Sequence, residues 1–346
     1  GKILAIGESL GNENLGIFFF IIIQVVINAL ILGYALSFLN KIDAPLLVRI
    51  VAFLFFSTFP FWVINSITYI KDTLYYLFLL YIFLYTYYHF KVLKDYRPKA
   101  FLWLTLLYCI LYLLRNTGLY VGIISLGALI LINIKNKRVA LKFLAVLVCF
   151  GLLHIVYHKV FLPGVDAKEA SVREMLSVPL QQTGRYLKYY YQELTNEEIK
   201  NLKKLFKGDL KEIGKDYNPN RSDEVKAKTK DYPKSTDLKA YFNAWASMFL
   251  KHPGVYVDAT LNNIYAYFYS EHKNFVDEEI GFYGITNNNP NLNIHFNNLE
   301  QGRLILENIA ASICDTPIIG LLYSCFIYTW ALLVLTFYIL SKKKYK

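Results

Sequence analysis

The sequence has little charge and little cysteine for its length. Only 18% of its 346 residues are charged, whereas 55% are hydrophobic and the mean hydropathy is +0.32. Ordinary soluble domains carry more charge and less apolar surface, so these values predict an integral membrane protein. Cys109, Cys149 and Cys325 lie within apolar runs and Cys314 lies just before one, without the spacing of zinc ligands. The composition therefore argues against a disulfide-rich fold and against a structural metal site.

Acidic residues are also scarce, at 26 against 37 Lys and Arg, which gives a formal net charge of +11. The basic residues lie in short loops beside apolar runs rather than in one patch, which is typical of membrane orientation signals and not of nucleic-acid binding. His154 and His158 have a spacing that suits a metal, but no third ligand accompanies them. We therefore expect no nucleic-acid partner and no metal centre.

A membrane span needs about 20 apolar residues. Runs near that length lie at 16–39, 45–64, 73–90, 100–114, 118–134, 139–161 and 317–340. We therefore expect an all-α integral membrane protein with about seven transmembrane helices.

Basic loops predict how these helices are oriented. The basic residues gather in the segments 91–99, 135–142 and 342–346. If the spans alternate, all three segments share one side, which the positive-inside rule assigns to the cytoplasm. The prediction is a multi-pass cell-membrane protein with a bundle of six helices (1–161), an extracytoplasmic helical domain (162–316), and a last helix with a basic cytoplasmic tail (317–346). Because the N-terminus would then lie outside without a signal segment, we also expect the chain to be preceded by further sequence.

Local signals predict the elements of the external domain. Thr195 and Glu198 have the spacing of a capping box, which predicts a helix over 196–206. Another helix should end at Lys251, and the next should begin at Pro253.

Turn-forming residues predict irregular structure elsewhere in this domain. The stretch 214–237 is expected to be a mobile surface loop, and 284–298 is expected to be a loop.

Two polar pairs stand where predicted spans meet on the outer side. "ITYIKDTLYYLF" places Lys71 and Asp72 before the third span, and Arg115 and Asn116 separate the fourth from the fifth. Charges at membrane depth cost several kcal/mol unless they are paired or face water, so they are functional candidates. Lys and Arg together suit a phosphate, with Asp72 keeping Lys71 protonated and aimed. The alternative is that the basic side chains extend to the interface or simply pair with Asp72.

Further polar candidates follow the sixth span. In "VPLQQTGRY", the amides of Gln181 and Gln182 and the guanidinium of Arg185 could hold a sugar or pyrophosphate, or could form the first turn of an ordinary helix. His252 could act as a base or be a helix-end residue. Gln24 and Asn28, one turn apart within the first span, are expected to hydrogen-bond across helices.

Several stretches together resemble a known group of proteins. They are "NLGIFFFIIIQ", "FPFWVINSITYIKDTLYYLFLL", "LLRNTGLYVGI", "SVPLQQTGRYLKYY" and "KHPGVYVDATLNNIYAYFY". They resemble an uncharacterised family of Gram-positive multispanning proteins. That family is similar in layout to the GT-C glycosyltransferases, which include the protein O-mannosyltransferases and the aminoarabinose transferase of lipid A. GT-C enzymes transfer sugars from polyprenyl phosphate or pyrophosphate donors on the outer face, with an acidic base in the first external loop.

The resemblance implies roles for the polar candidates. Lys71 and Arg115 would contact the lipid phosphate, with Asn116 beside them, and Asp72 would orient Lys71 or bind a divalent cation. Gln181, Gln182, Arg185 and His252 would line the sugar or acceptor side.

Most of the loop that carries the acidic base in GT-C enzymes has no counterpart in this sequence. The catalytic base is therefore expected upstream of Gly1, with Asp72 the remaining candidate within the chain. The expected partners are a polyprenyl-linked sugar donor, membrane lipid, and a glycan or lipid acceptor for cell-envelope synthesis. A lipid-linked glycan transporter and a non-catalytic membrane protein whose external domain binds a partner remain the alternatives.

Overall fold

The computed structural model describes residues 7–164, 171–269, 300–314, 316–317 and 319–342. Within these ranges every regular element is a helix, apart from two isolated β-bridges. The predicted all-α class is thereby confirmed for the described part of the chain. The expected loop 284–298 and the basic residues 343–346 lie outside it.

The chain divides into two compact units, which we describe one at a time. The first comprises Gly1–Ala167 with Phe282–Ala310, and the second comprises Lys168–Gly281 with Ala311–Lys346. The boundary between Ala310 and Ala311 falls within helix α17 (Glu300–Cys314).

The first unit is a helical bundle. Its helices are α2 (Glu13–Lys41), α3 (Leu46–Thr58), α4 (Pro60–Ile67), α5 (Lys71–Thr86), the π-helix η1 (Tyr87–Val92), α6 (Pro98–Leu114), α7 (Thr117–Ile132), α8 (Lys137–Val156), the π-helix η2 (Tyr157–Phe161) and α9 (Leu162–Gly164). Short-range signals set several boundaries: the side chains of Asn12 and Asn136 cap α2 and α8, and a proline opens α4 and α6. The expected second span is consequently divided into α3 and α4, because Pro60 has no amide hydrogen to continue α3.

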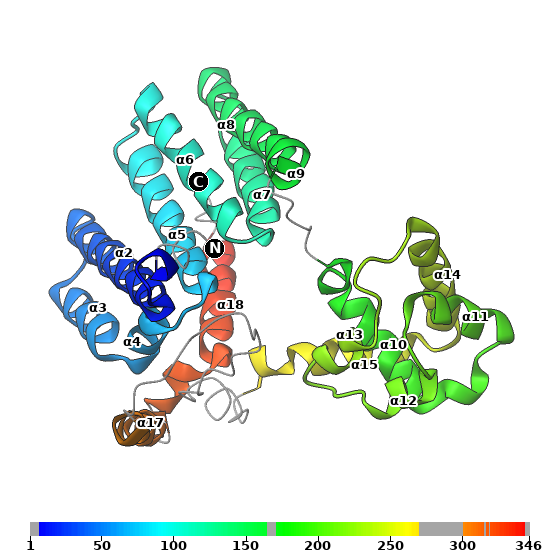
Figure 1. Ribbon diagram of the computed structural model, residues 1–346. Coiled ribbons are helices and arrows are strands. Elements are labelled where there is room, and N and C mark those ends of the chain that lie inside the picture. Colours follow the sequence, from blue (N-terminus) through cyan, green and yellow to red (C-terminus); the bar gives the residue numbers. More distant parts are fainter. Residues whose placement is uncertain (1–6, 165–170, 270–299, 315, 318, 343–346) are drawn as a thin grey trace. The chain divides into compact units, whose positions relative to one another are not determined.

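The helices of the first unit pack in sequence order. Helix α2 lies against α3, α4 and α5, α5 lies against α6, and α6 lies against both α7 and α8 (Figure 1). The core lies where α5 to α8 meet, and its most buried side chains include Leu104, Leu111, Leu126, Phe143 and Phe150. The consecutive helices α5, α6, α7 and α8 alternate in direction, so the loops 68–70 and 115–116 lie at one end of the bundle.

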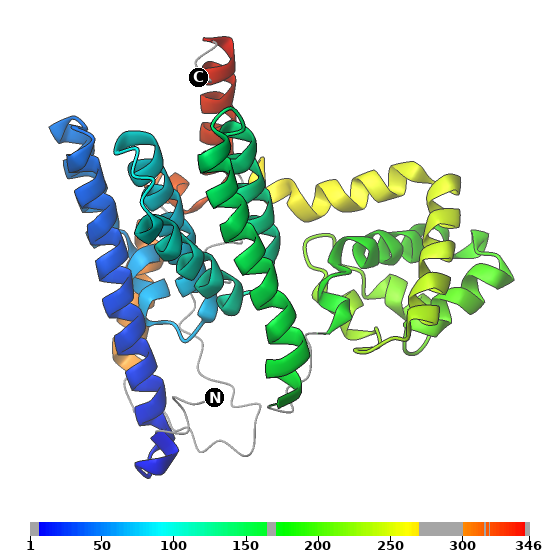
Figure 2. The same cartoon turned by 90° about the horizontal axis from the view of Figure 1, so that it is seen from above.

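Two helices are long and apolar enough to cross a membrane. They are Asn14–Lys41, seen along its length in Figure 2 (blue), and Lys137–Gly164, which is α8 with η2 and α9. Only 28% and 22% of their most apolar windows are buried within the protein, so they are not covered as the core helices of a soluble domain would be. The other apolar helices Leu46–Thr58, Pro98–Leu114, Thr117–Ile132 and Cys325–Ser341 are shorter. The structure thus supports membrane association through two helices, while the seven-span topology stays a prediction.

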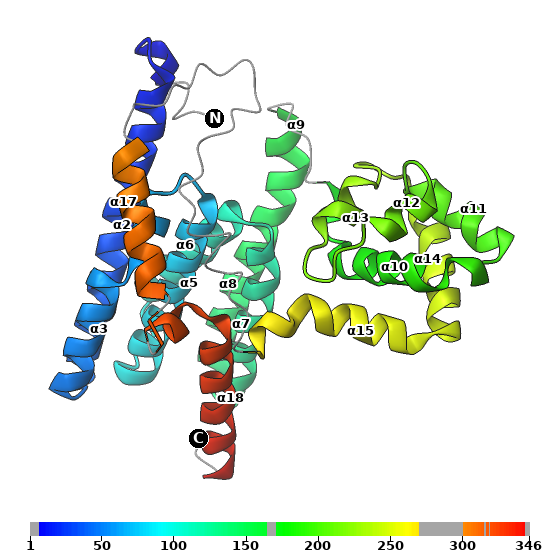
Figure 3. The same cartoon turned by 90° about the horizontal axis from the view of Figure 1, so that it is seen from below.

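The second unit contains a domain of short helices and one apolar helix near the C-terminus. Its elements are η3 (Val172–Glu174), α10 (Ser177–Tyr190), η4 (Tyr191–Glu193), α11 (Asn196–Leu205), α12 (Leu210–Lys215), α13 (Asp223–Ala227), α14 (Ser235–Lys251), α15 (Pro253–Ile264), η5 (Tyr265–Tyr267), η6 (Gly320–Tyr323) and α18 (Cys325–Ser341). Helix α10 packs against α12, α13, α14 and α15, so these four helices surround it, and α11 packs against α14 (Figure 3).

Sequence signals located three of these boundaries. The capping box of Thr195 and Glu198 opens α11, α14 ends at Lys251 and α15 begins at Pro253, as predicted. The prediction that 214–237 is a mobile loop is wrong in two respects. The stretch includes α13 and the start of α14, and it contributes Tyr217 and Val225 to the core, at 3% and 0% exposure. Its turn residues give it an irregular path, while these apolar side chains hold it against α10.

Candidate functional site

A buried glutamine fixes the reversal between α4 and α5. Gln24 of α2 is 0% exposed, and its Nε2 donates to the carbonyls of Asn65, Ser66 and Thr68 at 3.1, 2.9 and 2.7 Å. Carbonyls at a helix C-terminus have no partner within their own helix, so this amide acts as a cap supplied by another helix. The Thr73 hydroxyl also donates to the Asn65 carbonyl, at 3.0 Å. The start of α5 is thereby held against the end of α4.

The interhelical hydrogen bonds expected of the first span are confirmed. Besides the bonds of Gln24, Asn28 Nδ2 donates to the Trp62 carbonyl at 3.4 Å. Both residues therefore tie α2 to α4 and have a structural role.

A glycine allows the tight reversal between α6 and α7. A Cβ atom on Gly118 would lie 2.6 Å from the Leu111 carbonyl oxygen, so only glycine lets the first turn of α7 approach the last turn of α6 so closely. The Gly118 amide donates to the Arg115 carbonyl at 2.8 Å. This turn places Arg115 and Asn116 at the same end of the bundle as the start of α5.

The two predicted polar pairs meet at this end. Arg115 Nη1 lies 3.2 Å from Asp72 Oδ1, and the Arg115 guanidinium carbon lies 6.0 Å from the ring centre of Tyr75, one turn further along α5. Both charged side chains are partly exposed, and such ion pairs add about 0–1 kcal/mol of stability. The main consequence of the contact is therefore positional: it holds the start of α5 beside the turn between α6 and α7.

The partner of Asp72 matches one of the alternatives predicted from the sequence. The resemblance implied that Asp72 would orient Lys71 or bind a cation, and the alternative was that a basic side chain simply pairs with it. Its ion pair is with Arg115. Lys71 is exposed and forms no ion pair within the ranges that the structure describes. Residues adjacent in a helix point in different directions, so an acid reaches a partner on another helix more easily than its neighbour.

The electrostatic character of this end favours an anion. It carries the two positive charges of Lys71 and Arg115 against the single negative charge of Asp72. No side chain caps the N-terminus of α5 or of α7, where Asn116 is the preceding residue, so both helix starts keep their partial positive charge. We name this set of Lys71, Asp72, Arg115, Asn116 and the two helix starts the cationic end. Within this set, the Asp72 carboxylate forms an ion pair with Arg115.

A tyrosine and two histidines lie at the same end of the bundle. The Tyr112 hydroxyl lies 2.8 Å from His154 Nδ1, one turn before Arg115, and the His154 and His158 rings are 4.6 Å apart. Sequence reasoning missed Tyr112, because no local pattern relates residues 42 positions apart. Among the described residues no group of three metal-ligating side chains occurs, so the structure gives the possible divalent cation no defined site.

The two glutamines predicted to hold a sugar form hydrogen bonds within the second unit. Gln181 is 1% exposed and its Nε2 donates to the carbonyls of Asn218 and Pro219, at 2.8 and 3.3 Å. Gln182 donates to Thr260 Oγ1 at 2.9 Å and accepts from Trp245 Nε1 at 3.1 Å. These amides fasten α10 to its neighbours, and we therefore leave them out of the proposed binding site.

The charged candidates of this unit also have partners. Arg185 Nη2 donates to Asp258 Oδ2 at 3.1 Å; burial, the largest effect on the pKa of Arg185, lowers it, but Tyr217 and Asp258 together raise it. It therefore stays charged at neutral pH.

His252 occupies the corner between α14 and α15, as one of the sequence alternatives expected. Its Nε2 lies 2.6 Å from Glu193 Oε2, and its ring stacks on Tyr190 with the ring centres 4.0 Å apart. Its ring is thus held in place by two residues within the same unit.

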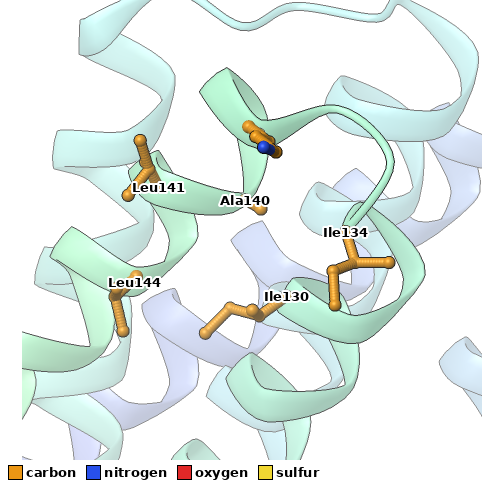
Figure 4. Close-up of a pocket in the computed structure, with 6 residues that line it drawn as sticks. Ile130, Ile134, Ala140, Leu141 and Leu144 are labelled. Carbon is orange, nitrogen blue, oxygen red and sulfur yellow. The ribbon is translucent and has the colours of Figure 1, made fainter.

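A shallow apolar pocket lies between α7 and α8. It is lined by Ile130, Ile134, Lys137, Ala140, Leu141 and Leu144 (Figure 4). These residues are at the end of α7 and the start of α8, so the pocket is at the opposite end of the bundle from the cationic end. With one basic residue and an otherwise aliphatic lining, it offers no set of polar groups for a charged substrate.

Comparisons with known proteins identify the family alone. No curated protein and no solved structure matches the chain. A family described as "Family of unknown function (DUF6020)" matches residues 1–346. Because the match extends over the whole sequence, the chain belongs to the DUF6020 family.

Proposed function

We propose that this protein is a membrane glycosyltransferase that uses a polyprenyl phosphate or pyrophosphate sugar on the outer face of the cytoplasmic membrane. The cationic end would hold the phosphate of the donor. The transfer reaction follows from the layout resemblance to GT-C enzymes, and the binding role follows from the arrangement of the charged side chains.

Membrane insertion of the whole bundle is part of this proposal. The 17 residues of α6 extend over about 26 Å, a little less than the hydrocarbon thickness of about 30 Å. A bilayer accommodates such a difference by thinning locally, at fractions of a kcal/mol per Å. Helices α2, α3 and α7 also present many exposed aliphatic side chains, such as Leu30, Leu47 and Ile124, which water would not favour.

The observation that carries the binding role is the contact between Asp72 and Arg115. It brings two uncapped helix starts, a guanidinium and the nearby Lys71 to one end of an apolar bundle. A phosphate attached to a polyprenyl chain needs positive groups at the depth where hydrocarbon ends, and this arrangement supplies them. Arg115 would bind phosphate oxygens, Lys71 would add a mobile point charge, and Asp72 would hold Arg115 in place.

The same groups suit a departing phosphate. Negative charge develops on the phosphate oxygens as the sugar leaves, and fixed positive groups in a partly dry site stabilise that charge. The residue that removes the acceptor proton is not assigned within the described chain.

Substitutions at the cationic end test the proposal. The protein would be reconstituted in lipid nanodiscs, and the affinity for a polyprenyl phosphate would be measured for the wild type and for Lys71→Ala and Arg115→Ala. Each charged contact contributes about 1.5–3 kcal/mol, so each variant should bind about tenfold to a hundredfold more weakly. Lys137→Ala is the matched control, because it removes a basic residue from the opposite end of the bundle.

Two outcomes would contradict the proposal. Unchanged affinity in both variants would exclude the cationic end as the phosphate site. The transfer step is tested separately in cells that lack the protein: polyprenyl-linked sugar should accumulate there, and an unchanged pool of donor lipids would leave phosphate binding without glycosyl transfer.

A further inference from the structure

Helix α15 is apolar on two opposite faces. Val255, Tyr256 and Ala259 are 7%, 2% and 0% exposed and belong to the buried part of the second unit. Val257 and Leu261, one turn apart on the other side, are 54% and 55% exposed. A surface helix of a soluble domain normally carries polar or charged residues on its outer face. The exposed aliphatic side chains on the outer face of α15 are therefore unusual for a surface that contacts only water.

Charge does not compensate for this exposed apolar face. The only charged residue of α15 is Asp258, and its carboxylate accepts a hydrogen bond from Arg185 at 3.1 Å. The outer face thus has aliphatic side chains and no unpaired charge.

The apolar surface continues beyond the end of α15. Tyr267, Phe268 and Tyr269 follow in and after η5, and they are 51%, 45% and 52% exposed. Exposed apolar side chains thus occur from Val257 through to Tyr269.

This surface leads directly to the apolar helix α18. Helix α18 packs against η5, and Trp330 Nε1 of α18 donates to the Phe268 carbonyl at 3.2 Å. Figures 2 and 3 both show α15 running crosswise to α18 within this unit. The described side chains of α18 include none that is buried, and Leu332, Val334 and Phe337 are among the most exposed. A helix with this surface suits hydrocarbon on all sides.

We propose that the outer face of α15, with Tyr267, Phe268 and Tyr269, lies in the headgroup region of the lipid bilayer and anchors the helical domain there. This inference rests on the membrane placement in the proposed function. If α18 crosses the membrane, a helix that runs crosswise to it and is joined to it through η5 and Phe268, near the start of α18, lies along the bilayer surface. Tyr and Trp concentrate at that level, where their rings meet both lipid and water. A lipid surface is favoured over a protein partner because the apolar face is continuous with a helix that is itself uncovered.

Spin-label accessibility tests this in the full chain. The four cysteines would be replaced by alanine, single cysteines would be introduced at Val257, Leu261, Leu335 or Lys200, and the labelled protein would be reconstituted in lipid nanodiscs. Oxygen concentrates in lipid and a nickel chelate stays in water, so the ratio of the two accessibilities reports depth. Leu335 in α18 is the lipid reference, and Lys200, exposed on α11, is the water reference.

We expect labels at 257 and 261 to give ratios of oxygen to nickel accessibility several-fold above the ratio at 200. Adding Leu261→Glu should lower the ratio at 257 by drawing the face toward water. Water-like ratios at 257 and 261 with a lipid-like ratio at 335 would overturn this inference and leave the membrane placement intact. A water-like ratio at 335 would overturn both. A label at 257 could also be inaccessible to both oxygen and the nickel chelate and show spin–spin broadening. That result would mean that a second copy of the protein covers the face, which also overturns the inference.

Discussion

Removing the Glu198 carboxylate should destabilise the helical domain of the second unit. Glu198 is 3% exposed, and its oxygens accept hydrogen bonds from the Thr195 amide, the Ser247 hydroxyl and Lys251 Nζ, each at 2.7 Å. It thus closes the capping box of α11 and ties α11 to α14. Every one of these contacts is lost in Glu198→Ala.

The magnitude follows from these three bonds. A hydrogen bond to a charged group contributes about 1.5–3 kcal/mol and a neutral one about 1 kcal/mol, and a helix cap contributes about 1 kcal/mol. Lys251 is partly exposed and can turn to water, which reduces the loss. We expect Glu198→Ala to lower the free energy of unfolding by about 3 kcal/mol. Glu198→Gln should cost about 1 kcal/mol, because its carbonyl can still accept from Thr195 and Lys251 while its amide donates to Ser247.

Tryptophan fluorescence measures this unfolding in urea. Trp245 is the only tryptophan within 171–269, so replacing Trp62, Trp103 and Trp330 by phenylalanine leaves one reporter in the domain. Glu197→Ala is the matched control: it removes an exposed acid from the same first turn of α11 and should cost less than about 0.5 kcal/mol.

The pH dependence gives an independent check. Burial is the largest single effect on the pKa of Glu198 and raises it, but the bonds from Lys251, Thr195 and Ser247 together lower the pKa below its ordinary value of 4.5. A carboxyl with a lowered pKa stabilises the fold above its unfolded pKa, and this contribution is lost as the pH falls through the folded value. The difference in the free energy of unfolding between wild type and Glu198→Ala should therefore have its full size at pH 6 and decrease below about pH 4.5. Equal stability of Glu198→Ala and Glu197→Ala, or a gap independent of pH, would refute the reasoning.

Two further predictions concern the turns of the first unit and use thermal unfolding in detergent. Gln24→Leu removes the amide that donates to three carbonyls at the end of α4, so stability should fall by about 1–3 kcal/mol. Val26→Leu on the exposed side of α2 is the control, and equal midpoints for the two variants would contradict the capping role. Gly118→Ala places a Cβ 2.6 Å from the Leu111 carbonyl oxygen and should cost at least about 2 kcal/mol. Gly127→Ala in the same helix meets no atom within 4 Å and should be neutral or slightly stabilising, so a similar loss in both would show that the close approach is unimportant.

The sequence by itself determined where several helices begin or end. The reason is that these signals act within a few residues: a proline without an amide hydrogen at α15, and the reciprocal hydrogen bonds of Thr195 and Glu198 at α11. Apolar runs likewise located the helices of the bundle, because a run of this kind must be hidden from water whatever covers it. The polar pairs at 71–72 and 115–116 could be singled out for the same reason.

Only the tertiary structure decided what these polar groups contact. Sequence reasoning left open whether Asp72 orients Lys71, binds a cation or pairs with a basic side chain, whereas the fold pairs it with Arg115 from another helix. It offered Gln181 as a ligand for sugar, whereas the fold directs that amide to the carbonyls of residues 37 and 38 positions away. Local patterns carry no information on such pairs, because which side chains meet depends on how whole helices pack. The fold alone likewise exposes an apolar face on α15 and joins it to α18, which was the basis for placing that helix at the membrane surface.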